Sequence, residues 1–196
     1  MTDVSTPVQP EVILILDEET LATDTDKAVI WWTCLIGYDI AKDEIIPVRH
    51  DQFYPIQPQL DRGRVIEADT MLFWMDQPYE VRKLMKECAS NDPTEITSLL
   101  VNFTTMFEAM VQGRPYELYA NSPSFDCNKL KSLYADWGFD IPWDFRQERC
   151  LRTLCSAAGV DQYAVPKVPG FIKHHAYHDC RQELAIYKAA RGIGVE

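Results

Sequence analysis

Apolar residues in the first part of the chain form three runs that predict β-strands. Residues 11–16 lead into the acids at 17–19, and residues 27–39 are almost continuously apolar and rich in β-branched and aromatic side chains. The second run therefore predicts a central strand covered on both faces. In the third run, residues 44–55, Pro47 favours an edge strand or a bulge, because proline cannot donate to a strand ladder. Short polar turns separate the runs, so we expect an antiparallel meander.

Beyond residue 68 the apolar spacing changes to that of helices. We expect helices over 69–77, 78–89, 92–112, 122–138 and 179–192, a strand over 116–121, and a strand turning into a helix over 149–159. Asp92 or Thr94 is the expected cap of the third helix, and Gly113 its end. This helix carries one apolar stripe: Ile96, Leu99, Leu100, Phe103, Phe107 and Met110. The order of elements predicts a mixed α/β sheet flanked by helices.

Composition sets limits on the class of protein. The chain has 196 residues and a net charge of -11, which argues for one domain and against a broad basic surface for nucleic acid. It does not argue against contact with phosphate through a divalent metal. Residues 1–10 are polar with two prolines and predict a loose arm without a signal peptide, so we expect a cytoplasmic protein. Its six cysteines form no close pair, and we expect free thiols.

The first strand leads into three consecutive acids. Side chains alternate across a strand, so Asp17 and Glu19 share one face and Glu18 points the other way, to solvent or a surface pair. Two carboxylates that close repel each other unless a cation lies between them. Hard cations such as Mg²⁺ take oxygen ligands of this kind.

Two further acids have places where they can join this pair. Asp126 lies near the start of a helix that follows a strand, and Asp179 near the start of the last helix. Each alone is more simply explained as a helix N-cap. Together with Asp17 and Glu19 they predict a metal pair at one rim of the sheet, an arrangement used for phosphoryl displacement.

Three motifs then resemble those of one family. D-x-E-T (Asp17, Glu19, Thr20), S-F-D ending at Asp126, and H-x-A-x-x-D (His174 to Asp179) are similar in order and spacing to the motifs of DEDDh 3′–5′ exonucleases, which have the RNase H-like fold. The likeness covers about residues 11–191 and is greatest for the phage exodeoxyribonucleases and a bacterial exoribonuclease branch. It implies one exonuclease domain over residues 11–196, in the host cytoplasm if the chain is phage-encoded.

The resemblance also assigns roles to the motif residues. Asp17 would bridge two Mg²⁺ or Mn²⁺ ions, Glu19 and Asp179 would complete the first site, and Asp126 would serve the second. His174 would take the proton of the attacking water, and nucleoside monophosphates would leave from a nucleic-acid 3′ end on a single strand or overhang. His175 takes this role if the alignment shifts by one residue, while His178 is expected to face outward.

Other interpretations of these histidines stay open. His174 and His178, spaced i, i+4 with Cys180 close by, would suit a zinc site, although a full ligand set is lacking. His50, beside Arg49 on the expected edge strand, is interpreted as a surface residue.

Substrate contacts are expected from residues next to the acids. Thr20 and Leu21 follow Glu19, Phe125 precedes Asp126, and Trp74 with Phe73 and Trp143 offers rings for base stacking. Core packing is the simpler explanation of Phe73, Trp74 and Trp143. The basic residues near the motifs would contact phosphate or form a solvated charged face: Lys129, Lys131, Arg146, Arg149 and Arg152.

The predicted function is a two-metal 3′–5′ exonuclease, with DNA slightly favoured over RNA. An oligoribonuclease-like enzyme would use the same residues, and a binding module of the same fold without activity is the alternative from another class. The sequence leaves strandedness and oligomeric state open.

Overall fold

A five-stranded sheet in the order β3-β2-β1-β4-β5 forms the centre of the molecule. The structure is a computed structural model and describes residues 9–23, 26–90 and 95–194. The first three strands pair antiparallel, and β4 and β5 add parallel to β1. Their bounds are β1 Val12–Thr20, β2 Ile30–Asp39, β3 Glu44–Phe53, β4 Tyr116–Ala120 and β5 Glu148–Cys150. The predicted meander and mixed sheet are confirmed, with the strand containing Pro47 at one edge.

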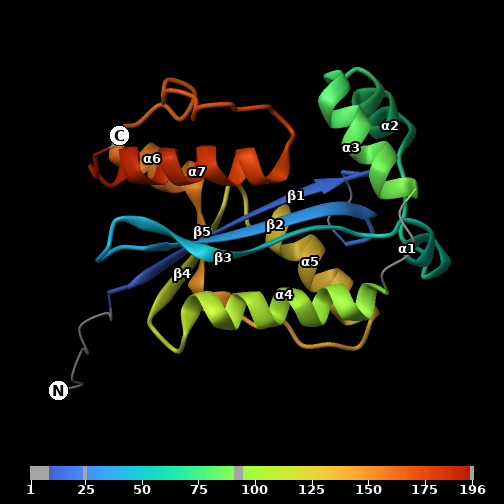
Figure 1. The fold of residues 1–196 in the computed structure, drawn as a ribbon, viewed down its shortest axis with the longest axis horizontal. Helices are drawn as coiled ribbons and strands as arrows, with labels where there is room; N and C mark the ends of the chain where they lie inside the picture. Colours follow the sequence, from blue (N-terminus) through green and yellow to red (C-terminus); the bar gives the residue numbers. More distant parts are fainter. Residues whose placement is uncertain (1–8, 24–25, 91–94, 195–196) are drawn as a thin grey trace.

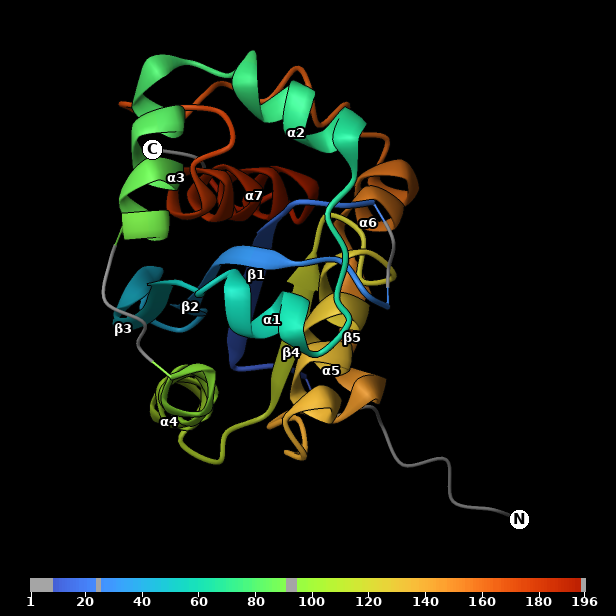
Figure 2. The same ribbon diagram turned by 90° about the vertical axis from the view of Figure 1, so that its right-hand side faces the viewer.

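Helices cover both faces of this sheet (Figure 1). α6 and α7 lie on one face, α4 and α5 on the other, and α2 with α3 stands beyond one end of the sheet (Figures 1 and 2). The helices are α1 Gln57–Asp61, α2 Ala68–Met75, α3 Tyr79–Ser90, α4 Ile96–Val111, α5 Asp126–Asp136, α6 Leu151–Ala158 and α7 Ala176–Ala190, with a 3₁₀ turn at Phe145–Gln147. α1 was not expected from the sequence.

The alternation of β1 divides the core into two clusters. Ile13 and Ile15 belong to the cluster under α7, whereas Leu14 and Leu16 belong to the cluster under α4 and α5. Every residue of β2 is buried, as expected of a central strand. The predicted apolar stripe of α4 is also buried throughout. These contacts fix α7 and α5 on opposite faces of β1, and both helices begin beside its acidic end.

The start and end of α4 can be compared with the prediction only in part. Asp92 and Thr94 lie outside the described residues, as does most of the expected arm, and Glu95 occupies the N-cap position. The helix ends as predicted, with Gly113 in a left-handed conformation (φ 72°). Glycine adopts this conformation without strain.

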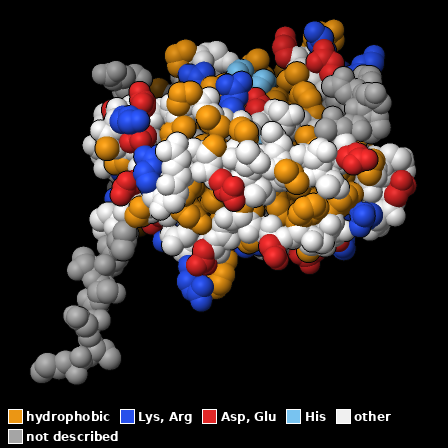
Figure 3. Space-filling view, turned by 60° about the horizontal axis from the view of Figure 1, so that its bottom comes forward, with side chains coloured by type: hydrophobic (Ala, Val, Ile, Leu, Met, Phe, Trp, Pro, Cys, Tyr) orange, Lys and Arg blue, Asp and Glu red, His pale blue; other side chains and the backbone are white. Residues whose placement is uncertain are grey.

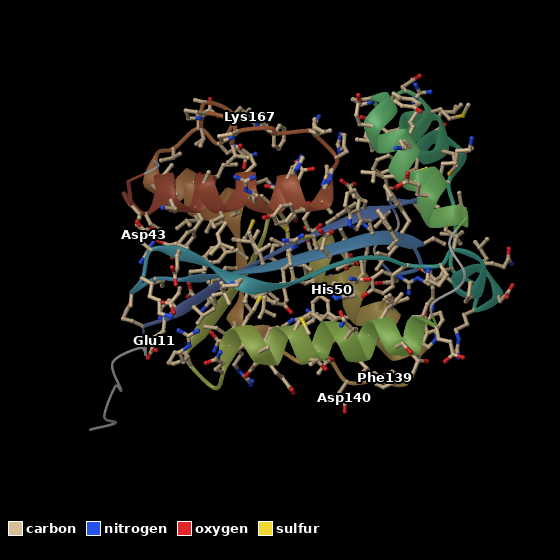
Figure 4. The ribbon with its side chains drawn as sticks, in the orientation of Figure 1. Glu11, Asp43, His50, Phe139, Asp140 and Lys167 are labelled. Carbon is tan, nitrogen blue, oxygen red and sulfur yellow. The ribbon has the colours of Figure 1, made fainter. Side chains whose placement is uncertain are left out.

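The surface position expected for His50 is wrong. Its side chain is fully buried, because α4 packs across β3 (Figure 4). Nδ1 lies 3.0 Å from Asn102 Oδ1, and Nε2 lies 3.2 Å from the Tyr54 hydroxyl. Burial lowers the pKa of His50 to about 4, so this imidazole is a neutral member of the core.

Two other expectations concern the whole chain. The cysteines whose side chains are described (34, 127, 150, 155 and 180) are free thiols, and all but Cys150 are buried, as predicted. Within the described ranges, no helix combines the length and apolar character that a membrane span requires.

Candidate active site

The acidic end of β1 lies inside the protein rather than in solvent. The strand continues through the acids to Thr20, with an irregular register between Glu19 and Thr20. Asp17 and Glu19 face α7, on the same side as Ile13 and Ile15. Asp17 Oδ2 is buried and makes no hydrogen bond among the described residues.

The solvent position expected for Glu18 is wrong, because α5 and the segment before α2 cover this face of β1. Glu18 is only 4% exposed, and neither of its carboxylate oxygens has a hydrogen-bond partner within the described part of the chain. Burial raises its pKa well above the usual value, and Asp126 adds to the shift. Lys129 and Arg64, both buried, oppose it.

Asp126 enters the site from α5. It is the first residue of that helix, and its Oδ2 accepts a long hydrogen bond of 3.4 Å from the Ser122 amide. The position before it, Phe125, is the N-cap and makes no side-chain cap. Burial raises the pKa of Asp126 to about 7, which is opposite to the effect expected of a simple capping carboxylate.

Asp179 and His174 come from the start of α7. Asp179 lies in the first turn, and its pKa is raised to about 6, mainly by burial. His174 precedes the helix with a left-handed backbone (φ 62°), a conformation that non-glycine residues adopt rarely and mostly at functional sites. Its Nδ1 lies 4.0 Å from Glu19 Oε1. Ligand atoms of Glu19, His174 and Asp179 all lie within 4.8 Å of one another.

The four predicted acids lie close enough for their charges to act on one another. Burial is the main cause of the raised pKa of Asp17, followed by the charges of Glu19, Asp179, Glu183 and Asp126. The pKa of Glu19 is raised by burial and then by Asp179 and Asp126. Among the described residues, none of these carboxylates forms an ion pair with Lys or Arg. Such a cluster is costly unless a cation joins it.

The donor set fits hard divalent ions. It consists of carboxylate oxygens with one imidazole, and it contains a buried oxygen, Asp17 Oδ2, that no hydrogen bond satisfies among the described residues. Mg²⁺ and Mn²⁺ prefer oxygen ligands. Asp17, Glu19, Asp126 and Asp179 are thus able to hold metal at this rim.

The three histidines near Asp179 occupy different surroundings. His174 lies beside the acids, whereas His175 stacks on His178 with 3.9 Å between ring centroids. His178 Nδ1 accepts a hydrogen bond from the Ile172 amide, and the Cys180 thiol points into the core toward the carbonyls of Ile15 and Cys34. The alternative zinc site is therefore wrong, since Cys180 and His178 are directed elsewhere.

A hollow of about 540 Å³ opens on one side of the acids. Aromatic rings and the metal-side residues line it together: Glu19, Thr20, Phe73, Trp74, Phe125 and His174. Phe73 and His174 meet edge to face with centroids 5.0 Å apart. Trp74 is 3% exposed, and its indole N–H donates to the Thr20 carbonyl (2.8 Å), so it also belongs to the core.

Leu21 and Trp143 lie deeper. Leu21 is 1% exposed, its amide donates to the Val29 carbonyl, and its carbonyl accepts from the Glu67 amide. Its side chain and backbone are thus engaged within the protein rather than in the hollow. Trp143 packs in the cluster under α4 and α5.

A second hollow of about 350 Å³ lies on the other side of Asp179. Its lining includes two lysines, Lys167 and Lys173, and two aromatic rings, Tyr163 and Phe171, from the loop before α7. Lys167 lies in the part of this loop that passes above α7 (Figure 4). The positive charges of Lys173 and Lys167 lower the pKa of Asp179.

Most other basic residues near the motifs are engaged elsewhere. Lys129 is fully buried, so neither the phosphate contact nor the solvated position expected for it is right. Lys131 pairs with Glu148 and Arg149 with Glu117, whereas Arg152 Nε donates to the Asn121 carbonyl. On the face seen in Figure 3, the basic side chains drawn lie scattered among acidic and apolar ones.

Glu183 is a further acid of the cluster and was not expected from the sequence. It lies one helical turn after Asp179 on α7 and is 8% exposed. The signal was present in the sequence, because residues four apart share a helix face and a second acid on that face would meet the first.

Comparisons with solved structures show the same fold at low sequence identity. Exonuclease I in its apo form matches with a TM-score of 0.62 and 14% identity over 94% of this chain and 43% of that one. Cell-death related nuclease 4 (CRN-4) matches with a TM-score of 0.54 and 15% identity over 94% and 64%. The metal-free E. coli ExoI–ssDNA complex matches with a TM-score of 0.57 and 11% identity over 93% and 40%. The chain thus spans less than two thirds of each of these proteins, and the predicted RNase H-like fold is confirmed.

A family model gives the more specific result. No curated protein sequence matches the chain significantly. The model of the Rv2179c-like 3′–5′ exoribonuclease domain matches residues 13–190, which include every acid of the site. The chain belongs to this family of Rv2179c-like 3′–5′ exoribonuclease domains.

Proposed function

We propose that this chain is a divalent-metal-dependent 3′–5′ exonuclease of the DEDDh type that releases nucleoside monophosphates from a nucleic-acid 3′ end. The observation that carries the proposal is the convergence of buried and half-buried carboxylates without a Lys or Arg partner among the described residues, beside His174. The family of the chain agrees with it. A binding module without activity would not need this costly arrangement.

Asp17, Glu19, Asp126 and Asp179 would hold two Mg²⁺ or Mn²⁺ ions. When bound, such a pair stabilises charge on the phosphate and lowers the pKa of the attacking water. Asp17 would be the ligand that both ions share, because the charges of Glu19, Asp126, Asp179 and Glu183 all act on it.

His174 is suited to act as the general base. Burial lowers its pKa to about 4, so the imidazole is neutral at pH 7, the form that accepts a proton. It takes a proton from water as the water oxygen attacks the last phosphodiester, and the P–O3′ bond breaks. The terminal nucleotide leaves with the 5′ phosphate, and the strand keeps a 3′ hydroxyl after receiving a proton.

The two hollows suggest how the strand lies. The aromatic hollow, with Thr20, Phe125 and Trp74, suits the terminal base, because bases stack on aromatic rings with little sequence preference. The second hollow offers Lys167 and Lys173 for the phosphates of the upstream strand. A 3′ end would then cross the acids with its last phosphodiester over them. Leu21 would support Thr20 from the core.

We propose RNA as the preferred polymer, since the matching family is described as exoribonuclease domains. The sequence-based preference for DNA stays a prediction, as does membership of the phage subgroup. Single-stranded DNA remains the competing substrate, because one similar structure is the E. coli ExoI–ssDNA complex.

The test uses matched RNA and DNA oligonucleotides with free or blocked 3′ ends, in Mg²⁺, Mn²⁺ or EDTA. We expect mononucleotide release from free ends only, loss of release in EDTA, and faster turnover of RNA. Absence of cleavage of either polymer with both metals would contradict the proposed function. Faster cleavage of DNA would contradict only the choice of polymer.

A further inference from the structure

Glu183 stands apart from the motif acids because neither its burial nor its position is explained by packing. It is 8% exposed, and its Oε2 is buried and makes no hydrogen bond among the described residues. Within the described ranges it also forms no ion pair. The side chain of the neighbouring Gln182, in contrast, makes hydrogen bonds with both of its polar atoms: it accepts from the Val168 amide and donates to the Pro166 carbonyl.

The surroundings of Glu183 are mostly negative. Burial raises its pKa well above the usual value, and the charges of Asp126 and Asp179 raise it further. Arg152 opposes the shift, although its Nε is engaged with the Asn121 carbonyl. The side chain also lines the hollow that contains Lys173. A carboxylate in this position either keeps a proton or contacts a cation.

Glu183 lies outside the group of ligand atoms around Glu19. Glu19, His174 and Asp179 bring their ligand atoms within 4.8 Å of one another, whereas Glu183 is not in that group. Among the charges that act on Glu183, that of Asp126 is the largest, and Glu183 in turn acts on Asp17. Glu183 therefore lies one helical turn from Asp179, in the wall of the hollow that Asp179 also lines, where the charges of the other acids act on it.

We propose that Glu183 is a further carboxylate of the metal cluster and binds one of its two ions, either directly or through a water bound to that ion. The inference rests on the proposed function. It goes beyond the motif residues, because it adds to the cluster a second carboxylate from α7, the helix that supplies Asp179.

A structural role is the competing explanation. A protonated Glu183 would act as a hydrogen-bond donor, but Oε2 has no acceptor among the described residues, and the protonated form would contribute little. Glutamine has nearly the same shape and no charge, so it would replace a structural Glu183 without loss. It would not replace a metal ligand, since a neutral amide binds Mg²⁺ or Mn²⁺ far less strongly than a carboxylate.

The experiment counts bound Mn²⁺ through the electron paramagnetic resonance signal of the free ion, without nucleic acid. We compare the wild-type chain with Glu183→Gln, and use Glu108→Gln on the exposed face of α4 as the matched control, because it removes the same charge far from the acids. Glu183→Asp keeps the carboxylate on a shorter side chain and serves as the second variant.

We expect two Mn²⁺ per wild-type chain and per Glu108→Gln chain. Glu183→Gln should keep one ion at wild-type affinity and bind the other at least about tenfold more weakly, which is about 1.4 kcal/mol. The affinity of Glu183→Asp for this second ion should lie between those of the wild type and Glu183→Gln. Binding of both ions by Glu183→Gln and Glu183→Asp as in the wild type would overturn this inference alone. No Mn²⁺ bound by the wild type would overturn the proposed function as well.

Discussion

The two ends of the central sheet both carry acids, but only one end supplies them with cations. At one end, Asp39 pairs with Arg114 at 2.7 Å, and Asp43 pairs with Lys188 at 2.8 Å. The pKa of Asp39 is lowered by its hydrogen bond to Arg114, and that of Asp43 by its hydrogen bond to Lys188. These carboxylates stabilise the fold.

At the other end, burial raises the pKa of each acid, and the charges of neighbouring acids raise those of Asp17 and Glu19 further. The pKa values of Asp17, Glu19, Asp126 and Asp179 all shift upward, and among the described residues none of these acids pairs with a lysine or arginine. The charges of Lys129, Arg152, Lys167 and Lys173 reduce the shifts of Glu19, Asp126 or Asp179. The contrast shows that this chain places basic partners beside acids that have only a structural role. Acids that lack such partners are available for ions that come from solution.

The largest expected effect is on turnover when one uncompensated acid is neutralised. Asp179→Asn removes a proposed metal ligand, so mononucleotide release should fall by about ten-thousandfold or more, equivalent to about 5.4 kcal/mol of barrier. The melting curve recorded without metal should stay cooperative. Collapse of the fold instead would show that Asp179 is structural, like Asp39.

His174 tests whether the imidazole transfers a proton or binds metal. His174→Ala should lower kcat by about a hundred- to ten-thousandfold, the usual contribution of a general base. Mn²⁺ affinity measured by calorimetry should stay within about threefold of wild type. A large loss of Mn²⁺ affinity would instead make His174 a ligand beside Glu19 and Asp179.

Divalent metal should stabilise the folded chain by joining the repelling carboxylates. At 100 times Kd, binding contributes about 2.7 kcal/mol, and for a chain of this size that shifts Tm upward by about 5–10 °C. Differential scanning fluorimetry with Mg²⁺, Mn²⁺ and EDTA measures the shift. Asp39→Asn, at the end where the acids have basic partners, should lower Tm but keep the metal-dependent rise in Tm. Loss of that rise in Asp39→Asn would contradict the comparison.

The smallest expected effect concerns pH without metal. The folded-state pKa of Asp126 is about 7 and that of Asp179 about 6, both above the values of an unfolded chain. The unfolded state therefore loses these protons first, and the free energy of unfolding should decrease from about pH 4 to pH 7. Chemical denaturation in EDTA measures this slope. His50 and His174, whose folded pKa values are both about 4, oppose this slope below about pH 6.5, so Asp126→Asn should be compared at each pH.

Local patterns were sufficient to predict much of the fold and most of the site. Alternation along β1 placed Asp17 and Glu19 on one face, and the spacing of H-x-A-x-x-D selected His174, the histidine that the structure places beside Glu19. Both conclusions depend on residues close in sequence or on fixed periods. The apolar stripe of α4 was predicted for the same reason.

The errors arise where packing between distant segments decides the outcome. Glu18 and His50 were expected at the surface, but α5 covers one and α4 the other. Lys129 is buried beneath Phe125, with its ammonium 2.5 Å from the centroid of that ring, although its neighbours in sequence gave no sign of this. Sequence periodicity predicts the face of a strand or helix, but not which element will cover it.

The most direct test of the proposed two-metal site is anomalous diffraction from crystals of the protein soaked in Mn²⁺. We predict two manganese peaks at the acidic end of β1, with Asp17 between them, Glu19 and Asp179 on one and Asp126 on the other. An unoccupied cluster at saturating Mn²⁺, or manganese bound only at other sites, would contradict it.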